Sequence, residues 1–82
     1  MKALKFEASW CAPCKMLSKT IEDAKDKLTV DIECIDIDEN AALAKQYGIR
    51  GVPTIVIVDD EGKEIKRQSG MMMESQLLQF LS

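Results

Sequence analysis

Apolar and polar positions follow two different periods along the chain, and the period changes from one segment to the next. Residues 3–8 alternate between apolar and polar, which is the period-2 pattern of a strand. Between residues 12 and 28, leucine, isoleucine and alanine recur at helical spacing among charged residues, so we predict an amphipathic helix there. Pro13 suits the first turn of this helix, where its missing N–H has no partner within the helix.

The rest of the chain continues this alternation of strands and helices. We expect strands at 30–37, 54–58 and 63–68 and helices at 40–47 and 73–81. Gly48 is placed to end its helix in the left-handed conformation, and residues 59–62 read as a hairpin turn. The predicted order is βαβαββα. Because strands joined by a helical crossover are parallel and a hairpin is antiparallel, this order indicates an α/β fold with a four-stranded mixed sheet flanked by helices.

Composition agrees with a small folded protein. The chain has 82 residues, which favours a single domain over residues 1–82, and 46% of them are hydrophobic. Its net charge is −3, with 11 basic and 14 acidic residues interspersed, so no basic surface for nucleic acid or anionic lipid is indicated. The run at 55–58 is too short to span a bilayer, and residues 1–7 lack the apolar core of a secretory signal. We therefore expect no membrane association and a cytoplasmic location.

The cysteines divide into a pair and a single residue. Cys11 and Cys14 form a C-x-x-C motif, Cys34 stands alone, and the chain has no histidine. This excludes Cys–His nucleophilic catalysis and imidazole metal sites. Half of a zinc site is also written C-x-x-C, but four ligands are needed and only one further cysteine remains. We therefore expect no bound metal.

A C-x-x-C pair at the start of a helix is suited to disulfide exchange. The attacking group is a thiolate, and the unpaired N–H groups and positive dipole end at a helix N-terminus favour the thiolate of Cys11. The two-residue spacer keeps Cys14 within reach of the mixed disulfide that Cys11 would form. The pair is expected to be exposed, with Trp10 as a flat apolar wall beside it.

Two sequence motifs resemble those of the thioredoxin family. They are Trp10-Cys11-Ala12-Pro13-Cys14-Lys15 and Tyr47-Gly48-Ile49-Arg50-Gly51-Val52-Pro53-Thr54, with a glycine, Gly70, before the last helix as in the family. The resemblance covers essentially the whole chain and implies a minimal thioredoxin-like fold. Thioredoxins usually carry an additional strand and helix before the strand that leads to the cysteines, and the glutaredoxin motifs are absent here.

The resemblance implies a thiol–disulfide oxidoreductase that reduces protein disulfides. Cys11 would be the nucleophile and Cys14 the resolving thiol, and Val52–Pro53 would be a cis peptide bond facing them. The alternative for Pro53 is an ordinary proline at the start of a strand. The implied substrate groove comprises Trp10, Ala12, Pro13, Gly51, Val52, Pro53, Gly70 and Met71. The family also implies a monomer without a bound cofactor, which receives electrons from a thioredoxin reductase linked to NADPH and passes them to oxidised proteins.

The chain departs from the family at two positions. Lys5 stands where thioredoxins usually carry a buried aspartate, and Cys34 stands where they commonly have its lysine partner. The charge of Lys5 would stabilise a Cys14 thiolate if it were buried, although a lysine here more commonly extends its ammonium group to solvent, which is the expectation we favour. Cys34 is expected to be a small buried hydrophobic residue; the alternative is a thiol beside Lys5 that traps Cys14 in a second disulfide.

Two further segments receive structural interpretations. Among Met71, Met72 and Met73, at least one is expected to fill the core beneath the last helix, while an exposed Met71 would adapt to varied substrates. The acidic stretch at 36–39 is interpreted as a solvated rim without a function.

Two other functions remain open from the sequence. One is a glutaredoxin-like reductase that takes electrons from glutathione. The other is a thioredoxin-fold binding subunit in which the dithiol is incidental and an exposed sheet edge meets the partner.

Overall fold

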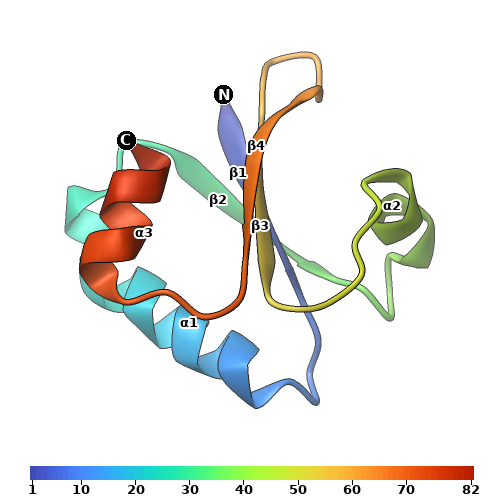
Figure 1. Cartoon of the computed structure of the whole chain (residues 1–82), viewed down its shortest axis with the longest axis horizontal. Coiled ribbons are helices and arrows are strands. Elements are labelled where there is room, and N and C mark those ends of the chain that lie inside the picture. The colour runs from blue at the N-terminus through green and yellow to red at the C-terminus, as the bar shows by residue number, and fades with distance from the viewer.

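Four strands form one sheet in the order β2-β1-β3-β4 in the computed structural model, which describes residues 1–82 (Figure 1). The strands are β1 (Lys2–Glu7), β2 (Asp31–Asp36), β3 (Thr54–Val58) and β4 (Glu64–Ser69). β1 pairs parallel with β2 and antiparallel with β3, and β3 pairs antiparallel with β4. The mixed four-stranded sheet and the element order βαβαββα confirm the predicted fold class.

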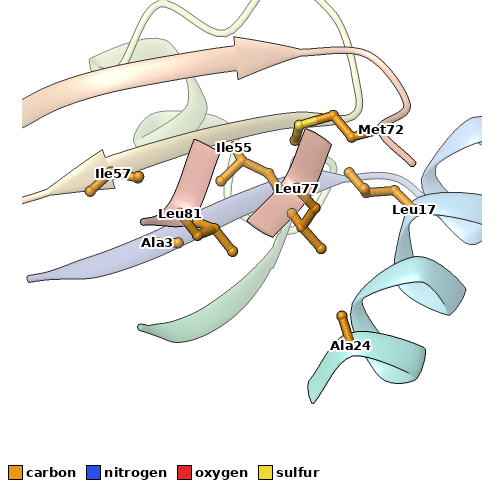
Figure 2. Close-up of a cluster of buried hydrophobic side chains, with 8 residues drawn as sticks. All are labelled: Ala3, Leu17, Ala24, Ile55, Ile57, Met72, Leu77 and Leu81. Atoms are coloured by element: carbon orange, nitrogen blue, oxygen red, sulfur yellow. The ribbon is translucent and has the colours of Figure 1, made fainter. Parts of the chain in front are cut away.

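Helices cover both faces of this sheet. Figure 1 shows α1 (Ala12–Ala24) and α3 (Glu74–Leu81) on one side and α2 (Ala41–Gln46) on the other. Because successive side chains of a strand point to opposite faces, β1 and β3 contribute to two separate cores. The core on the side of α1 and α3 comprises Ala3, Leu17, Ala24, Ile55, Ile57, Met72, Leu77 and Leu81 (Figure 2). The core on the side of α2 comprises Leu4, Phe6, Ile35, Ala44, Val56 and Val58.

The connection from β2 to β3 differs from our expectation. β3 runs antiparallel to β1, and therefore to β2, although helix α2 lies between β2 and β3 in the sequence. Thr54 at the start of β3 pairs with Phe6 near the C-terminal end of β1. The chain therefore enters β3 at the same end of the sheet at which it left β2. The rule that a helical crossover makes strands parallel is thus wrong for this connection. Its consequence is that the Val52–Pro53 segment arrives at the end of β1 that leads to Cys11.

The ends of several elements also differ slightly from prediction. α1 stops at Ala24, and one turn of 3-10 helix, Lys25–Lys27, replaces its predicted last turn. β4 is shifted by one residue and contains an irregularity opposite Ile57 and Val58. Every residue of β4 is exposed, as predicted for an edge strand. None of the helices has both the length and the apolar character required to cross a bilayer.

Candidate active site at the Cys11–Cys14 disulfide

Cys11 and Cys14 form a disulfide at the N-terminus of α1, with Cα atoms 5.2 Å apart. Cys11 is the N-cap residue, and its sulfur accepts a hydrogen bond from the backbone N–H of Cys14 at 3.1 Å. Pro13 occupies the first turn, as predicted. The prediction of an exposed pair is wrong, because only 4% of Cys11 and 2% of Cys14 are exposed. Both pack with Ala8, Ile37 and Val52, so most of the disulfide is covered by apolar side chains.

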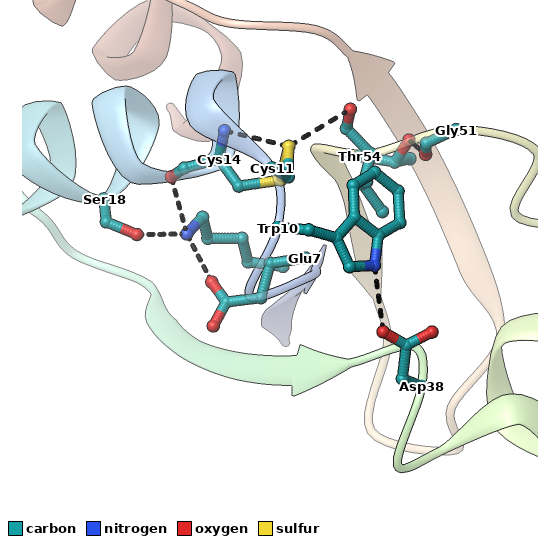
Figure 3. Close-up of a disulfide and its surroundings, with 10 residues drawn as sticks. Glu7, Trp10, Cys11, Cys14, Ser18, Asp38, Gly51 and Thr54 are labelled. Carbon is teal, nitrogen blue, oxygen red and sulfur yellow. Dashed lines mark hydrogen bonds and ion pairs between the residues drawn. A yellow bond between two sulfur atoms is a disulfide. The ribbon is translucent and has the colours of Figure 1, made fainter.

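The segment before β3 faces the disulfide. Val52–Pro53 is a cis peptide bond, as the resemblance implied, and the carbonyl oxygen of Val52 lies 3.7 Å from the sulfur of Cys11 (Figure 3). The Thr54 hydroxyl donates to the Gly51 carbonyl at 2.7 Å, and the Gly70 N–H donates to the Pro53 carbonyl at 2.8 Å. These two hydrogen bonds hold the Gly51–Thr54 segment and Gly70 together beside Cys11.

Trp10 is 67% exposed and is held in place by a residue that sequence reasoning did not assign. Its indole Nε1–H donates to the carboxylate of Asp38 at 3.0 Å (Figure 3). Asp38, interpreted from the sequence as part of a solvated rim without a function, is exposed and holds the indole of Trp10, the residue next to Cys11. The signal available in the sequence was topological: the carboxyl ends of two parallel strands meet at one edge of the sheet, and Trp10 and Asp38 follow β1 and β2 there.

Lys5 does not extend to solvent, and this expectation is corrected. The residue is fully buried, with 0% exposure, on the face of β1 that α1 covers. Its ammonium group forms an ion pair with Glu7, donates to the Ser18 hydroxyl, and lies 3.3 Å from the carbonyl oxygen of Cys14 (Figure 3). A buried ammonium group is tolerated only when acceptors surround it, and Glu7 and Ser18 supply them. Neither residue was recognised from the sequence.

Cys34 is exposed, so the prediction of a buried hydrophobic residue is wrong. It lies on the edge strand β2, directly opposite Lys5 of β1 in the parallel register. Partial burial of the sulfur and the negative charge of Glu7 raise the pKa of the Cys34 thiol, while the charge of Lys5 acts in the opposite direction. Cys34 thus lies beside Lys5, as the alternative interpretation required, but its environment disfavours the reactive thiolate.

The raised pKa of Cys34 predicts slow alkylation. In the oxidised protein Cys34 is the free cysteine, so iodoacetamide reports on it directly. At neutral pH its alkylation is expected to be slower than in the urea-unfolded chain, and the rate should keep rising with pH beyond the range of an ordinary thiol, because only the thiolate reacts. Glu7→Gln removes the negative charge and is expected to speed the reaction. Equal rates in the folded and unfolded chains would contradict this account.

The other residues named for the groove differ in exposure. Ala12, Pro13 and Gly51 are exposed, whereas Val52, Gly70 and Met71 are partly buried. Met72 fills the core beneath α3, which confirms the expectation for the methionine run. Met71 lines a cavity of about 280 Å³ between β4 and α3, together with Gln68, Met72, Gln76, Gln79 and Phe80.

Comparison with known proteins gives one consistent result. The model of the family described as thioredoxin matches residues 2–82. The chain is 36% identical over 78 residues to a thioredoxin of Chlamydia caviae, covering 94% of this chain and 76% of that protein. Among solved structures, a mutant thioredoxin from Halobacterium salinarum is similar with a TM-score of 0.86 and 38% identity, over 96% of this chain and 69% of the other.

A thioredoxin from Fasciola hepatica is similar with a TM-score of 0.83 and 34% identity, over 96% of this chain and 75% of that structure. These likenesses extend over nearly the whole chain, including the helix N-terminus that carries the disulfide and the cis-proline segment that faces it. The chain therefore belongs to the thioredoxin family and is a thiol–disulfide oxidoreductase, a thioredoxin-type protein-disulfide reductase with a redox-active C-x-x-C pair.

Proposed function

We propose that Cys11 is the nucleophile and Cys14 the resolving thiol of this reductase. The observation that carries the assignment is the N-cap position of Cys11, whose sulfur accepts the N–H of Cys14 at 3.1 Å. A thiolate at this position gains the same hydrogen bond and the positive end of the helix dipole. Cys14 lies one turn inside the helix, where that stabilisation is smaller and where its sulfur reaches Cys11.

The reaction then proceeds by two exchanges. The Cys11 thiolate attacks one sulfur of a substrate disulfide, the Cys11–substrate bond forms, and the other substrate sulfur leaves with the electron pair and takes up a proton. Cys14 loses its proton and attacks the sulfur of Cys11. The Cys11–Cys14 bond forms, and the second substrate sulfur leaves as a thiolate that is protonated by solvent. Two electrons have passed from the dithiol to the substrate.

The substrate segment lies in the shallow groove around Cys11. In this proposal it extends along the backbone of Val52, whose carbonyl oxygen lies beside the Cys11 sulfur. An extended peptide that pairs with this backbone gains affinity independently of its side chains, which suits a reductase of many proteins. Trp10, oriented by Asp38, forms one wall. The other groove residues are Ala12, Pro13, Gly51, Pro53, Gly70 and Met71.

Regeneration of the dithiol requires an electron donor. The donor in this proposal is a thioredoxin reductase that draws on NADPH, and the protein acts as a monomeric carrier in the cytoplasm without a bound cofactor. Membership of the thioredoxin family supports these assignments. Purified protein with NADPH and a thioredoxin reductase should reduce insulin disulfides, whereas glutathione with its reductase should not replace that system.

Trapping of a mixed disulfide tests the division of roles. In Cys14→Ser, combined with Cys34→Ser to remove the third thiol, the first exchange takes place but the second cannot. The variant is expected to accumulate a covalent complex with an oxidised substrate protein, linked through Cys11, and non-reducing electrophoresis with peptide mass mapping detects it. The matched variant Cys11→Ser with Cys34→Ser should form little complex. Equal trapping through Cys14 in the matched variant would reverse the assignment.

A further inference from the structure

Lys5 places a positive charge beside the backbone of Cys14. Its side chain is fully buried, and its ammonium group lies 3.3 Å from the carbonyl oxygen of Cys14. Its other partners are the carboxylate of Glu7, whose side chain is 29% exposed, and the hydroxyl of Ser18. Burial of an ammonium group costs free energy even when it is paired, and an apolar residue of similar volume would fill the same space. Packing alone therefore does not account for a lysine at this position.

Cys14 also lines a cavity on the same side of the molecule. The cavity has a volume of about 250 Å³ and is lined by Glu7, Ala8, Ser9, Cys14, Lys15, Ser18 and Asp36. None of these residues belongs to the Val52–Pro53 segment that faces Cys11. The cavity is thus separate from the groove at Cys11, and Glu7, the ion-pair partner of Lys5, lines it.

We propose that Lys5 is a positioning residue for the resolving step, holding its charge where it stabilises the Cys14 thiolate, and that Glu7 offsets part of this charge. The inference rests on the proposed roles of Cys11 and Cys14. In the mixed-disulfide state the Cys14 thiol gives its proton to water in the cavity, and its sulfur then attacks Cys11. An opposite charge close to an ionising group favours the ionised form, and the effect is larger where water is excluded.

The other charged groups around Cys14 contribute less. Lys15 lines the cavity but is exposed, so solvent screens its charge. Asp36 also lines the cavity, and its carboxylate accepts the backbone N–H groups of Asp38 and Glu39 at 2.8 and 3.3 Å, which hold it at the end of β2. Lys5 is therefore the charged residue that directly contacts Cys14, through the Cys14 carbonyl. Glu7 is linked to Cys14 through its ion pair with Lys5.

Direct titration of Cys14 tests the proposal without any substrate. In the Cys11→Ser, Cys34→Ser background Cys14 is the remaining thiol, and ultraviolet absorbance of the thiolate gives its titration midpoint. Lys5→Met is expected to raise this midpoint by about one pH unit, and Glu7→Gln to lower it. Lys19→Met, which removes an exposed lysine of α1, is the matched control and should leave the midpoint unchanged. Circular dichroism confirms that each variant is folded, and Lys5→Gln replaces Lys5→Met if the latter is not.

A kinetic readout separates an electrostatic role from a structural one. In protein with both Cys11 and Cys14, a mixed disulfide of thionitrobenzoate on Cys11 resolves at a rate that follows the thiolate fraction of Cys14. Lys5→Met should slow this step about tenfold near neutral pH and much less at alkaline pH, where Cys14 is ionised in both proteins. A midpoint that fails to move in the stated direction in either variant overturns the proposal. Because the titration involves no substrate, that result leaves the proposed function intact, and failure to trap a substrate on Cys11 leaves the titration valid.

Discussion

Replacement of Cys11 by serine is expected to lower kcat/KM for the reduction of protein disulfides by a factor of at least about 1,000. The hydroxyl of serine is not ionised near neutral pH and does not exchange with a disulfide, so the hydrogen bond from the Cys14 N–H would have no thiolate to stabilise. Reduction of insulin disulfides, followed by turbidity with dithiothreitol or a reductase as the electron source, measures the loss.

The fold should survive this substitution. Serine is smaller than cysteine and is a preferred N-cap residue, so α1 retains a side-chain acceptor for its first N–H groups. The matched variant is Cys34→Ser, which lies on the exposed edge strand and should keep nearly full activity. Substantial turnover by Cys11→Ser, or a comparable loss in Cys34→Ser, would falsify the placement of the chemistry at the N-terminus of α1.

Truncation of Phe6 to alanine is expected to lower the free energy of unfolding by about 3–5 kcal/mol. Phe6 is fully buried in the core on the α2 side of the sheet, where its ring lies 5.8 Å from that of Tyr47. The substitution removes the apolar contacts of the ring and leaves a cavity that the rigid sheet cannot close. In a domain whose total stability is about 5–15 kcal/mol, this is a large fraction.

Thermal and urea unfolding followed by circular dichroism measure this effect. The melting temperature should fall by more than about 10 °C, because each kcal/mol moves the midpoint of a domain of this size by roughly 4–8 °C. Met16→Ala is the control, since Met16 is 57% exposed on α1 and its loss should change stability by less than about 0.5 kcal/mol. A change below about 1 kcal/mol in Phe6→Ala would show that the α2 side contributes little to stability.

Local patterns in the sequence were sufficient to predict most of the fold. The apolar run of β3 is a strong signal because the strand is buried on both faces, and the helical spacing of α1 is one because the helix buries a single apolar face. The glycine after α2 adopts a positive φ of 64°, as its position indicated. The two motifs led to the disulfide and the cis-proline segment, whose contact joins residues 41 positions apart.

The errors arose where the outcome depends on a partner from another element. A lysine within an alternating strand is usually at the surface. The buried position of Lys5 is tolerable because Glu7, the Ser18 hydroxyl on α1 and the Cys14 carbonyl supply acceptors for its ammonium group. Cys34 was judged by its apolar neighbours, but its strand lies at the sheet edge, which the order of the strands decides. The antiparallel direction of β3 likewise depends on the path of residues 47–53 rather than on helix α2 itself.

The division of the interior into two cores by β1 limits changes in chain length. Ala3 and Lys5 point to one side of the sheet, and Leu4 and Phe6 point to the other. Insertion of a single residue within β1 would exchange these two sides for every residue before it, bringing apolar and charged side chains into the wrong layer. The Asp59–Gly62 turn connects two antiparallel strands at the surface and carries no such restriction. Natural or engineered relatives of this protein should therefore vary in length at that turn and keep the number of residues within the first strand constant.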